Sequence, residues 1–258
     1  MLKFAFFPGC VSQGGAPELY PATMQICQRL GIEVEEIRGW TCCGAGVMQE
    51  KNQLFADTLN ARTFAKAEQL GLPIMTICST CQGVMSQANH RLRRDPQYLA
   101  EINSYLAEEG IEYRGTAEPK HLLWILIEDY GLDKLLQQVT RPLGELRVAP
   151  FYGCYILRPT EALDIEEHPE RQTSLETLIQ TLGATSVDFA GKTRCCGFPI
   201  LTINEKNSMA MVANHTSEAK DLGADVMVTP CPLCHLNLDG FQPKEASKAR
   251  RQIGRAHV

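Results

Sequence analysis

Ten of the eleven cysteines fall into two sets with the same order along the chain: a single cysteine, then Cys-Cys-Gly, then Cys-x-x-Cys. The first set comprises Cys10, Cys42, Cys43, Cys78 and Cys81. The second set comprises Cys154, Cys195, Cys196, Cys231 and Cys234. A shift of 153 positions places the last four cysteines of the first set on the last four of the second, whereas the two leading cysteines are 144 positions apart. The sequence therefore indicates an internal duplication with one metal site in each copy.

The number and adjacency of these cysteines narrow the choice of metal. Thiolates are soft ligands that bind zinc, copper(I) or iron–sulfur clusters. A structural zinc ion takes four ligands, commonly from two separated Cys-x-x-Cys pairs, and has no place for a fifth thiolate or for adjacent cysteines. A cluster of several irons offers separate ligand positions, so neighbouring cysteines can each reach a different iron. Five thiolates in each copy therefore favour an iron–sulfur cluster, with structural zinc as the main alternative.

Two glycines support this interpretation. Gly44 and Gly197 each follow a Cys-Cys pair directly. A residue without Cβ lets the backbone turn tightly and brings its N–H group close to sulfur. Hydrogen bonds of this kind help to set the reduction potential of a cluster.

The composition bounds the class of protein. With 44% hydrophobic and 21% charged residues the chain has the composition of a soluble globular protein. Its longest strictly apolar run, residues 122–127, is too short to cross a bilayer, so we expect no transmembrane segment. The opening MLKFAFFPGC lacks the cleavage site of a signal peptide, which predicts a cytoplasmic protein. A net charge of −5 argues against a nucleic-acid partner.

Each half alternates predicted strands and helices, with the cysteines in the turns between them. The first half has predicted strands at residues 3–7, 32–37 and 73–77 and predicted helices at 17–30 and 52–70. The second half repeats this order with strands at 146–152, 185–189 and 225–229 and helices at 173–182 and 205–222. We therefore expect an α/β fold of two pseudo-symmetric repeats of βαβ units, with parallel strands and the cysteine sets in the loops at the strand ends.

The two copies differ in length. Residues 79–94, 96–108 and 120–138 have helical patterns and no full counterpart after Cys234. We expect a first cysteine-rich domain at 1–144 and a second at 145–251 that is truncated at its C-terminal end. Residues 253–258, IGRAHV, correspond to the translation of a common sequencing-adapter read, so 252–258 are expected to be a non-native tail. The alternative is a basic tail, residues 244–255, that docks a partner.

Longer motifs around the cysteines connect the chain to a known family. They are FFPGC from Phe6, YGCYILRP from Tyr152 to Pro159, and CHLNLD from Cys234 to Asp239. With the two complete cysteine sets, these motifs resemble the family of heterodisulfide reductase B subunits, which is defined by duplicated cysteine-rich CCG domains. The resemblance implies that each set of five cysteines binds one noncubane [4Fe-4S] cluster. It also implies that a disulfide substrate lies between the two clusters and is cleaved with one electron from each.

Residues outside the sets add little chemistry. Cys27 lies inside a predicted helix and is expected to be a small core residue. His235 directly follows Cys234 and is a candidate proton donor to a departing thiolate, with a role at a helix end as the alternative. No catalytic residue is assigned beyond the cluster ligands and this candidate. Arg158, Lys192 and Arg194 flank the second set and are either solvated surface residues or attract an anionic thiol substrate.

These observations predict the iron–sulfur catalytic subunit of a heterodisulfide-reductase-like complex, which reduces a small disulfide or a lipoyl carrier, or oxidises the corresponding thiols. The chain has no nucleotide-binding fingerprint after a strand, so its electrons must come from partners. The resemblance implies a ferredoxin-like iron–sulfur subunit and a flavoprotein subunit. One alternative is a CCG-type electron-transfer subunit of a quinone-linked dehydrogenase of the succinate, glycolate or lactate type. A second alternative is a structural zinc scaffold.

Overall fold

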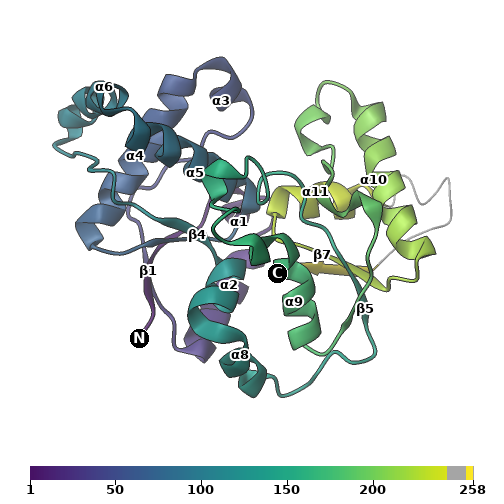
Figure 1. Ribbon diagram of the computed structural model, residues 1–258. Helices are drawn as coiled ribbons and strands as arrows, with labels where there is room; N and C mark the ends of the chain where they lie inside the picture. The colour runs from purple at the N-terminus through teal and green to yellow at the C-terminus, as the bar shows by residue number, and fades with distance from the viewer. Residues whose placement is uncertain (243–253, 258) are drawn as a thin grey trace.

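The computed structural model describes residues 1–242 and 254–257, which form two four-stranded parallel sheets (Figure 1). The first sheet has the order β2-β1-β3-β4, with β1 at Lys3–Phe7, β2 at Glu33–Glu36, β3 at Ile74–Thr76 and β4 at Pro119–His121. The second has the order β6-β5-β7-β8, with β5 at Arg147–Pro150, β6 at Thr185–Ser186, β7 at Val226–Thr229 and β8 at Gly254–His257. The shared order confirms the predicted α/β fold of two pseudo-symmetric repeats.

The central strands β1, β3, β5 and β7 are short and largely buried, whereas the edge strand β2 is mostly exposed. In β1 the residues Phe4, Ala5, Phe6 and Phe7 are all buried, which is typical of a parallel strand covered on both faces. β1 pairs with β3 so that Phe7 lies beside Thr76, and the equivalent strands β5 and β7 also pair in parallel. The carboxyl ends of the strands in each sheet therefore point to one edge, where the cysteines follow.

Four helices of the first half lie close to their predicted positions: α2 (Leu19–Leu30), α4 (Gln53–Leu70), α5 (Ser79–Arg94) and α6 (Pro96–Leu106), with the 3-10 turn η1 at Ala107–Glu109. Two short helices, α1 (Cys10–Gln13) and α3 (Val47–Lys51), were not predicted. Asn52 caps α4, because its side chain accepts a hydrogen bond of 3.0 Å from the Phe55 N–H. The predicted start of this helix at residue 52 is thus its N-cap.

The second half repeats the long helix and its cap. Its helices are α9 (Ser174–Thr181), α10 (Glu205–Asp221) and α11 (Pro232–Gly240), with 3-10 turns η3 (Glu161–Leu163), η4 (Pro169–Thr173), η5 (Ala190–Thr193) and η6 (Phe198–Ile200). Asn204 caps α10 by accepting a hydrogen bond of 3.1 Å from the Asn207 N–H, just as Asn52 caps α4. The duplication therefore extends to the residues that start each helix.

The predicted helix at 120–138 is wrong in part. Lys120 and His121 belong to β4, which pairs with β3, and the segment then forms α7 (Leu122–Trp124), the π-helical turn η2 (Ile125–Gly131) and α8 (Leu132–Gln138). Gly131 has a positive φ of 92° and separates η2 from α8. Without β4, the backbone N–H and C=O groups along the outer edge of β3 would lack partners, so this segment pairs with β3 although its sequence pattern predicts a helix.

The end of the chain has a partial counterpart in the first half. Strand β8 pairs with β7 so that His257 lies beside Thr229, as His121 lies beside Thr76 in the first sheet. Backbone pairing of this kind does not depend on side-chain identity, so the expectation of a non-native tail at 252–258 stays a prediction. Most of the predicted basic tail at 244–255 lies outside the described residues.

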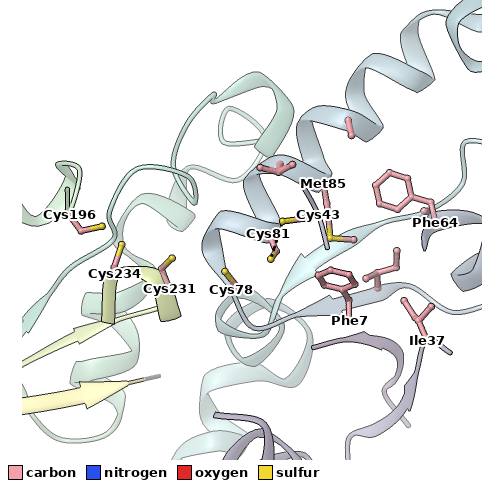
Figure 2. Close-up of a cluster of buried hydrophobic side chains, with 14 of the residues drawn as sticks. Phe7, Ile37, Cys43, Phe64, Cys78, Cys81, Met85, Cys196, Cys231 and Cys234 are labelled. Atoms are coloured by element: carbon pink, nitrogen blue, oxygen red, sulfur yellow. Dashed lines mark hydrogen bonds between the residues drawn. The ribbon is translucent and has the colours of Figure 1, made fainter. Parts of the chain in front are cut away.

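The two halves share one buried core that includes cysteines of both sets (Figure 2). This core joins Phe7, Phe64 and Met85 of the first half to Phe151 and Val212 of the second. Smaller apolar clusters lie under α9 and under α2, and the latter contains Cys27, which is buried at 1% exposure. Cys27 is therefore a core residue, as expected. Among the described residues, no helix combines the length and apolarity needed to cross a membrane.

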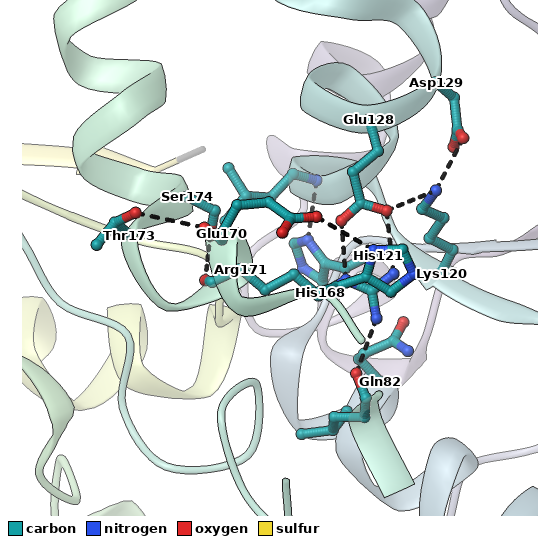
Figure 3. Close-up of polar contacts among 12 residues, drawn as sticks. Gln82, Lys120, His121, Glu128, Asp129, His168, Glu170, Arg171, Thr173 and Ser174 are labelled. Atoms are coloured by element: carbon teal, nitrogen blue, oxygen red, sulfur yellow. Dashed lines mark hydrogen bonds and ion pairs between the residues drawn. The ribbon is translucent and has the colours of Figure 1, made fainter. Parts of the chain in front are cut away.

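A buried ion pair ties the halves together beside this core (Figure 3). Arg171 donates two hydrogen bonds to Glu128, of 2.8 and 3.0 Å, and its guanidinium lies 4.3 Å above the Trp124 ring. Burial raises the pKa of Glu128, but hydrogen bonds from Arg171 and Lys120 bring it below its ordinary value. Glu128 also lies near His168 and Glu170. Because two cations already neutralise Glu128, we interpret this group as an ion-pair network and not as a metal site.

Candidate metal centre

The first cysteine set gathers at the carboxyl edge of the first sheet. Cys10 begins α1 just after β1, Cys42 and Cys43 lie in the loop after β2, and Cys78 and Cys81 lie at the start of α5 after β3. The sulfur atoms of Cys10 and Cys42 are 3.8 Å apart, and those of Cys43 and Cys81 are 3.4 Å apart. The two adjacent cysteines thus face different partners.

The second set repeats this arrangement at the edge of the second sheet. Cys154 follows β5, Cys195 and Cys196 follow β6, and Cys231 and Cys234 lie at the start of α11 after β7. The side chains of Cys195 and Cys154 interact, as do those of Cys196 and Cys234, and these are the equivalents of the two pairs in the first set. The predicted ligands are therefore brought together five by five, with the same pairing in each half.

The glycines after the Cys-Cys pairs have the expected role. The Gly44 N–H donates to the Cys42 sulfur at 3.5 Å, and the Gly197 N–H donates to the Cys195 sulfur at 3.4 Å. Both glycines have positive φ, 78° and 90°, which a residue with a Cβ rarely adopts. Their backbone N–H groups can therefore stabilise negative charge on the bound sulfur.

Each set has an exposed side and a buried side. Cys10 is exposed, Cys42, Cys154 and Cys195 are half-buried, and the remaining set members are buried. A hydrogen bond from Cys10 lowers the pKa of Cys42 to about 2, and one from Cys154 lowers the pKa of Cys195 to about 2. Hydrogen bonds to these same two cysteines, together with burial, raise the pKa values of Cys43 and Cys196 to about 12.

The spacing of the sulfurs distinguishes between the metals. Four thiolates around one zinc ion, with Zn–S bonds of about 2.3 Å, lie about 3.8 Å from one another. In the described parts of the chain no three cysteine sulfurs all lie within 4.8 Å of one another. The sulfurs therefore interact two at a time, with Cys42 next to both Cys10 and Cys43, and such a row of thiols fits a core of several metal ions better than a single ion.

The two sets touch each other. The side chains of Cys78 and Cys231 interact where the two sheet edges meet, and Figure 2 shows them between the halves. Thr80 Oγ1 lies 3.1 Å from the Cys231 sulfur, although the two residues belong to different halves. Burial raises the pKa of Cys231, but hydrogen bonds from Cys234, Cys78, Ser79 and Thr80 bring it well below its usual value. The pKa of Cys78 is raised, first by its hydrogen bond to Cys231.

Backbone contacts hold the two sets against each other. The Pro230 carbonyl, next to Cys231, lies 3.0 Å from the Ser79 N–H and 3.0 Å from His121 Nε2. Gly83 on α5 lies so close to Tyr155 that an added Cβ would be 2.5 Å from the Tyr155 carbonyl oxygen. The first turn of α5 is therefore fixed against the second half at the point where the cysteine sets meet.

A cavity of about 480 Å³ opens on the exposed side of the second set. Its lining residues are Cys154, Arg158, Arg194, Cys195, Met211, Asn214 and His215. Arg158 donates a hydrogen bond to the Thr193 carbonyl, and His215 Nε2 lies 3.0 Å from the Cys195 carbonyl. Lys192 is not part of this lining and instead pairs with Glu176 and Asp188. Two of the three cations singled out in the sequence thus border the site.

His215 is a residue of the site that the sequence analysis did not single out. No motif in the sequence places His215 at the site, because it lies 20 residues beyond Cys195 on α10 and reaches the site only through packing. His235, the candidate proton donor, has its Nε2 3.7 Å from Glu18 and 4.0 Å from Asp239. Its role in proton transfer stays a prediction.

A second, apolar groove of about 590 Å³ lies between α2, α8 and α9. Leu19, Ala22, Ile26, Leu122, Leu126, Leu135, Leu178 and Leu182 supply most of its apolar lining. Glu18, which contacts His235 beside Cys234, also lines the groove. The groove therefore extends from the neighbourhood of the second cysteine set along the helices under the sheets.

Known proteins resemble the chain over most of its length. It is 39% identical to the 8-methylmenaquinol:fumarate reductase membrane anchor subunit of Wolinella succinogenes, over 99% of the chain and 89% of that protein. It is 33% identical to the B subunit of the ferredoxin/F(420)H(2)-dependent CoB-CoM heterodisulfide reductase of Methanosarcina acetivorans, over 94% of the chain and 81% of that protein.

A solved structure shares the fold. The crystal structure of a hypothetical protein from Helicobacter pylori superposes with a TM-score of 0.78 at 14% identity, covering 99% of the chain and 47% of that protein. The model of the cysteine-rich domain family, CCG, matches residues 4–86 and 148–239, one match for each cysteine set. With both halves matched, the chain belongs to the CCG cysteine-rich domain family, of which it carries two copies.

Proposed function

We propose that the chain is the iron–sulfur subunit of an oxidoreductase complex and that each cysteine set holds one noncubane [4Fe-4S] cluster. The supporting observation is the identical pairing of sulfurs in two sets of five, in which adjacent cysteines face different partners. Each cluster, when bound, takes up and releases one electron. The ligands would be Cys10, Cys42, Cys43, Cys78 and Cys81 for the first cluster and Cys154, Cys195, Cys196, Cys231 and Cys234 for the second.

We infer that the complex reduces a disulfide. Cleavage of an S–S bond consumes two electrons and two protons and yields two thiols. The contact between Cys78 and Cys231 brings two one-electron sites side by side, which suits this stoichiometry. Arg158 and Arg194 border the cavity at the second set, so a substrate with an anionic end would be attracted there. Electrons would come from a ferredoxin-like subunit and a flavoprotein.

A second candidate is electron transfer between a quinol and a partner dehydrogenase. The observation that favours it is the apolar groove, which suits a hydrophobic quinol and has Glu18 and His235 near one end to accept protons. The similarity to the quinol:fumarate reductase subunit of W. succinogenes supports the same chemistry. In this case the two clusters would carry electrons singly from the quinol to the dehydrogenase.

Both candidate functions require an iron–sulfur cluster in each cysteine set, and metal analysis tests this requirement. Protein purified and reconstituted without oxygen should contain iron and sulfide in both sets, with loss of about half the iron in Cys43→Ala and in Cys196→Ala. Cys27→Ala is the matched control, because this buried cysteine lies outside both sets, and it should retain all the iron. Zinc without iron in the wild-type protein would support the scaffold alternative and overturn the proposal.

Turnover by the complete complex separates the two candidates. We expect reduction of a disulfide that carries a sulfonate or phosphate group, with a higher KM in the Arg158→Gln/Arg194→Gln double variant and an unchanged KM for a neutral disulfide. Oxidation of a menaquinol analogue without cleavage of either disulfide would overturn the disulfide proposal. That result, combined with a raised KM for the quinol in Leu126→Gln, would establish the second candidate.

A further inference from the structure

The two cysteine sets differ at the place where they touch. The Cys-x-x-Cys motif of the first set encloses Ser79 and Thr80, whereas that of the second encloses Pro232 and Leu233. These positions correspond under the shift of 153 that relates the two copies. The first half therefore presents two hydroxyl groups to the second, and the second half presents none in return at the equivalent positions.

The hydroxyl of Thr80 is placed to act on the second set. Its Oγ1 lies 3.1 Å from the Cys231 sulfur, and both residues are buried, at 8% and 1% exposure. A sulfur bound to metal carries no proton, so in this pair the hydroxyl must be the donor. The hydrogen bond between the Ser79 N–H and the Pro230 carbonyl, 3.0 Å long, holds the first turn of α5 in this position.

Ser79, the other hydroxyl of this motif, also hydrogen-bonds to Cys231, whereas the backbone donors to sulfur are nearly equal in the two halves. Gly44 and Gly197 each donate one backbone N–H, at 3.5 and 3.4 Å, so their effects largely cancel. Arg158 and Arg194 add positive charge near the second set, where the first set has Gly14 and Thr41 at the corresponding positions. The greater exposure of Cys10 works in the opposite direction by letting water stabilise the first set.

We propose that Thr80 is a positioning residue that makes the second cluster the easier of the two to reduce. A hydrogen bond to a ligand sulfur favours the more negative, reduced state and so raises the reduction potential. The first electron to arrive would then rest at the second set, next to the arginine-lined cavity, and a second electron would occupy the first set. This inference rests on the proposed binding of two clusters.

Removing the hydroxyl without changing the shape of the side chain tests the proposal. Thr80→Val should make reduction of one cluster about tenfold less favourable, which for a one-electron couple is a downward shift of about 59 mV. The measurement is a redox titration of the reconstituted protein followed by electron paramagnetic resonance, in which one of two midpoints should move. Thr80→Ser should restore it. Thr63→Val is the matched control, since its buried hydroxyl donates to the Leu59 carbonyl and not to sulfur.

A mirror variant tests the same idea from the other side. Leu233→Thr places a hydroxyl at the corresponding position of the second half, so it should raise the midpoint that Thr80→Val leaves unchanged. This variant also serves if Thr80→Val fails to load iron. Normal iron content with both midpoints unmoved, or with both moved equally, would overturn the inference alone. Absence of iron from the wild-type protein would overturn the proposed function and the inference with it.

Discussion

Substitution of Gly44 by alanine should destabilise the first metal site selectively, and Gly71 at the end of α4 provides a control. Both glycines have positive φ, 78° and 66°, so alanine at either position meets a backbone penalty of about 1–2 kcal/mol. At Gly44 the new Cβ would also lie 3.1 Å from the Ala56 Cβ on α4, whereas at Gly71 it meets nothing within 4 Å. Overpacking against a buried helix adds about 1–3 kcal/mol.

The expected free energy of unfolding therefore falls by about 2–5 kcal/mol in Gly44→Ala and by about 1–2 kcal/mol in Gly71→Ala. Because the Gly44 N–H donates to the Cys42 sulfur, its displacement should also reduce the iron content of the first set. The assay is urea unfolding of the reconstituted protein without oxygen, together with iron per chain. Gly44→Ala should lose up to half the iron, and Gly71→Ala should retain it.

A second substitution checks the stated cause. Ala56→Gly removes the atom that the new Cβ would meet, so the double variant Gly44→Ala/Ala56→Gly should lose less stability than the sum of the single variants. Equal losses of stability and iron in Gly44→Ala and Gly71→Ala would refute the reasoning. The penalty would then come from backbone conformation alone, and the contact with α4 would have no part in shaping the site.

Three further predictions concern the packing of the two halves and the charges around them. Gly83→Ala should lower the free energy of unfolding in urea by about 1–3 kcal/mol, because its Cβ would lie 2.5 Å from a backbone carbonyl of the other half. Gly240→Ala, where the new Cβ meets nothing within 4 Å, should be neutral or stabilising. Equal effects of the two substitutions on stability would contradict the close approach of Gly83 to the other half. Arg171→Met should lower the free energy of unfolding by about 3 kcal/mol, because it leaves Glu128 partly unpaired. A double-mutant cycle with Glu128→Gln should show a coupling energy between the two residues, and its absence would mean that the pair is a surface contact without effect on stability. Burial lowers the pKa of Lys192, but hydrogen bonds to its two acidic partners raise it overall, so its contribution to stability is complete below its unfolded pKa of about 10.4 and is lost as the pH rises through the folded value. Between about pH 9 and pH 12, Lys192→Met should therefore lose less stability than the wild-type protein. Parallel profiles of stability against pH for the two proteins would be the contrary result.

Local patterns along the chain were sufficient for most of the elements. The apolar run of β1, the long helix α4 with Asn52 at its start, and the repeat of both in the second half follow from periodicity and capping residues. The same approach failed for residues 120–138, where a helical pattern begins with the strand β4. An edge strand is stabilised by its neighbour β3, 43 or more residues earlier, and a short window of sequence holds no information about that pairing.

The sequence by itself determined the duplication, the two sets of five thiols and hence the kind of metal they suit, because ligand type, number and adjacency are properties of the chain. Only the tertiary structure decided which thiols pair, that the sets meet at Cys78 and Cys231, and that Thr80 of one half lies against a ligand of the other. The physical reason is that these contacts join residues up to 153 positions apart. They form through the packing of one half against the other, which no local spacing records.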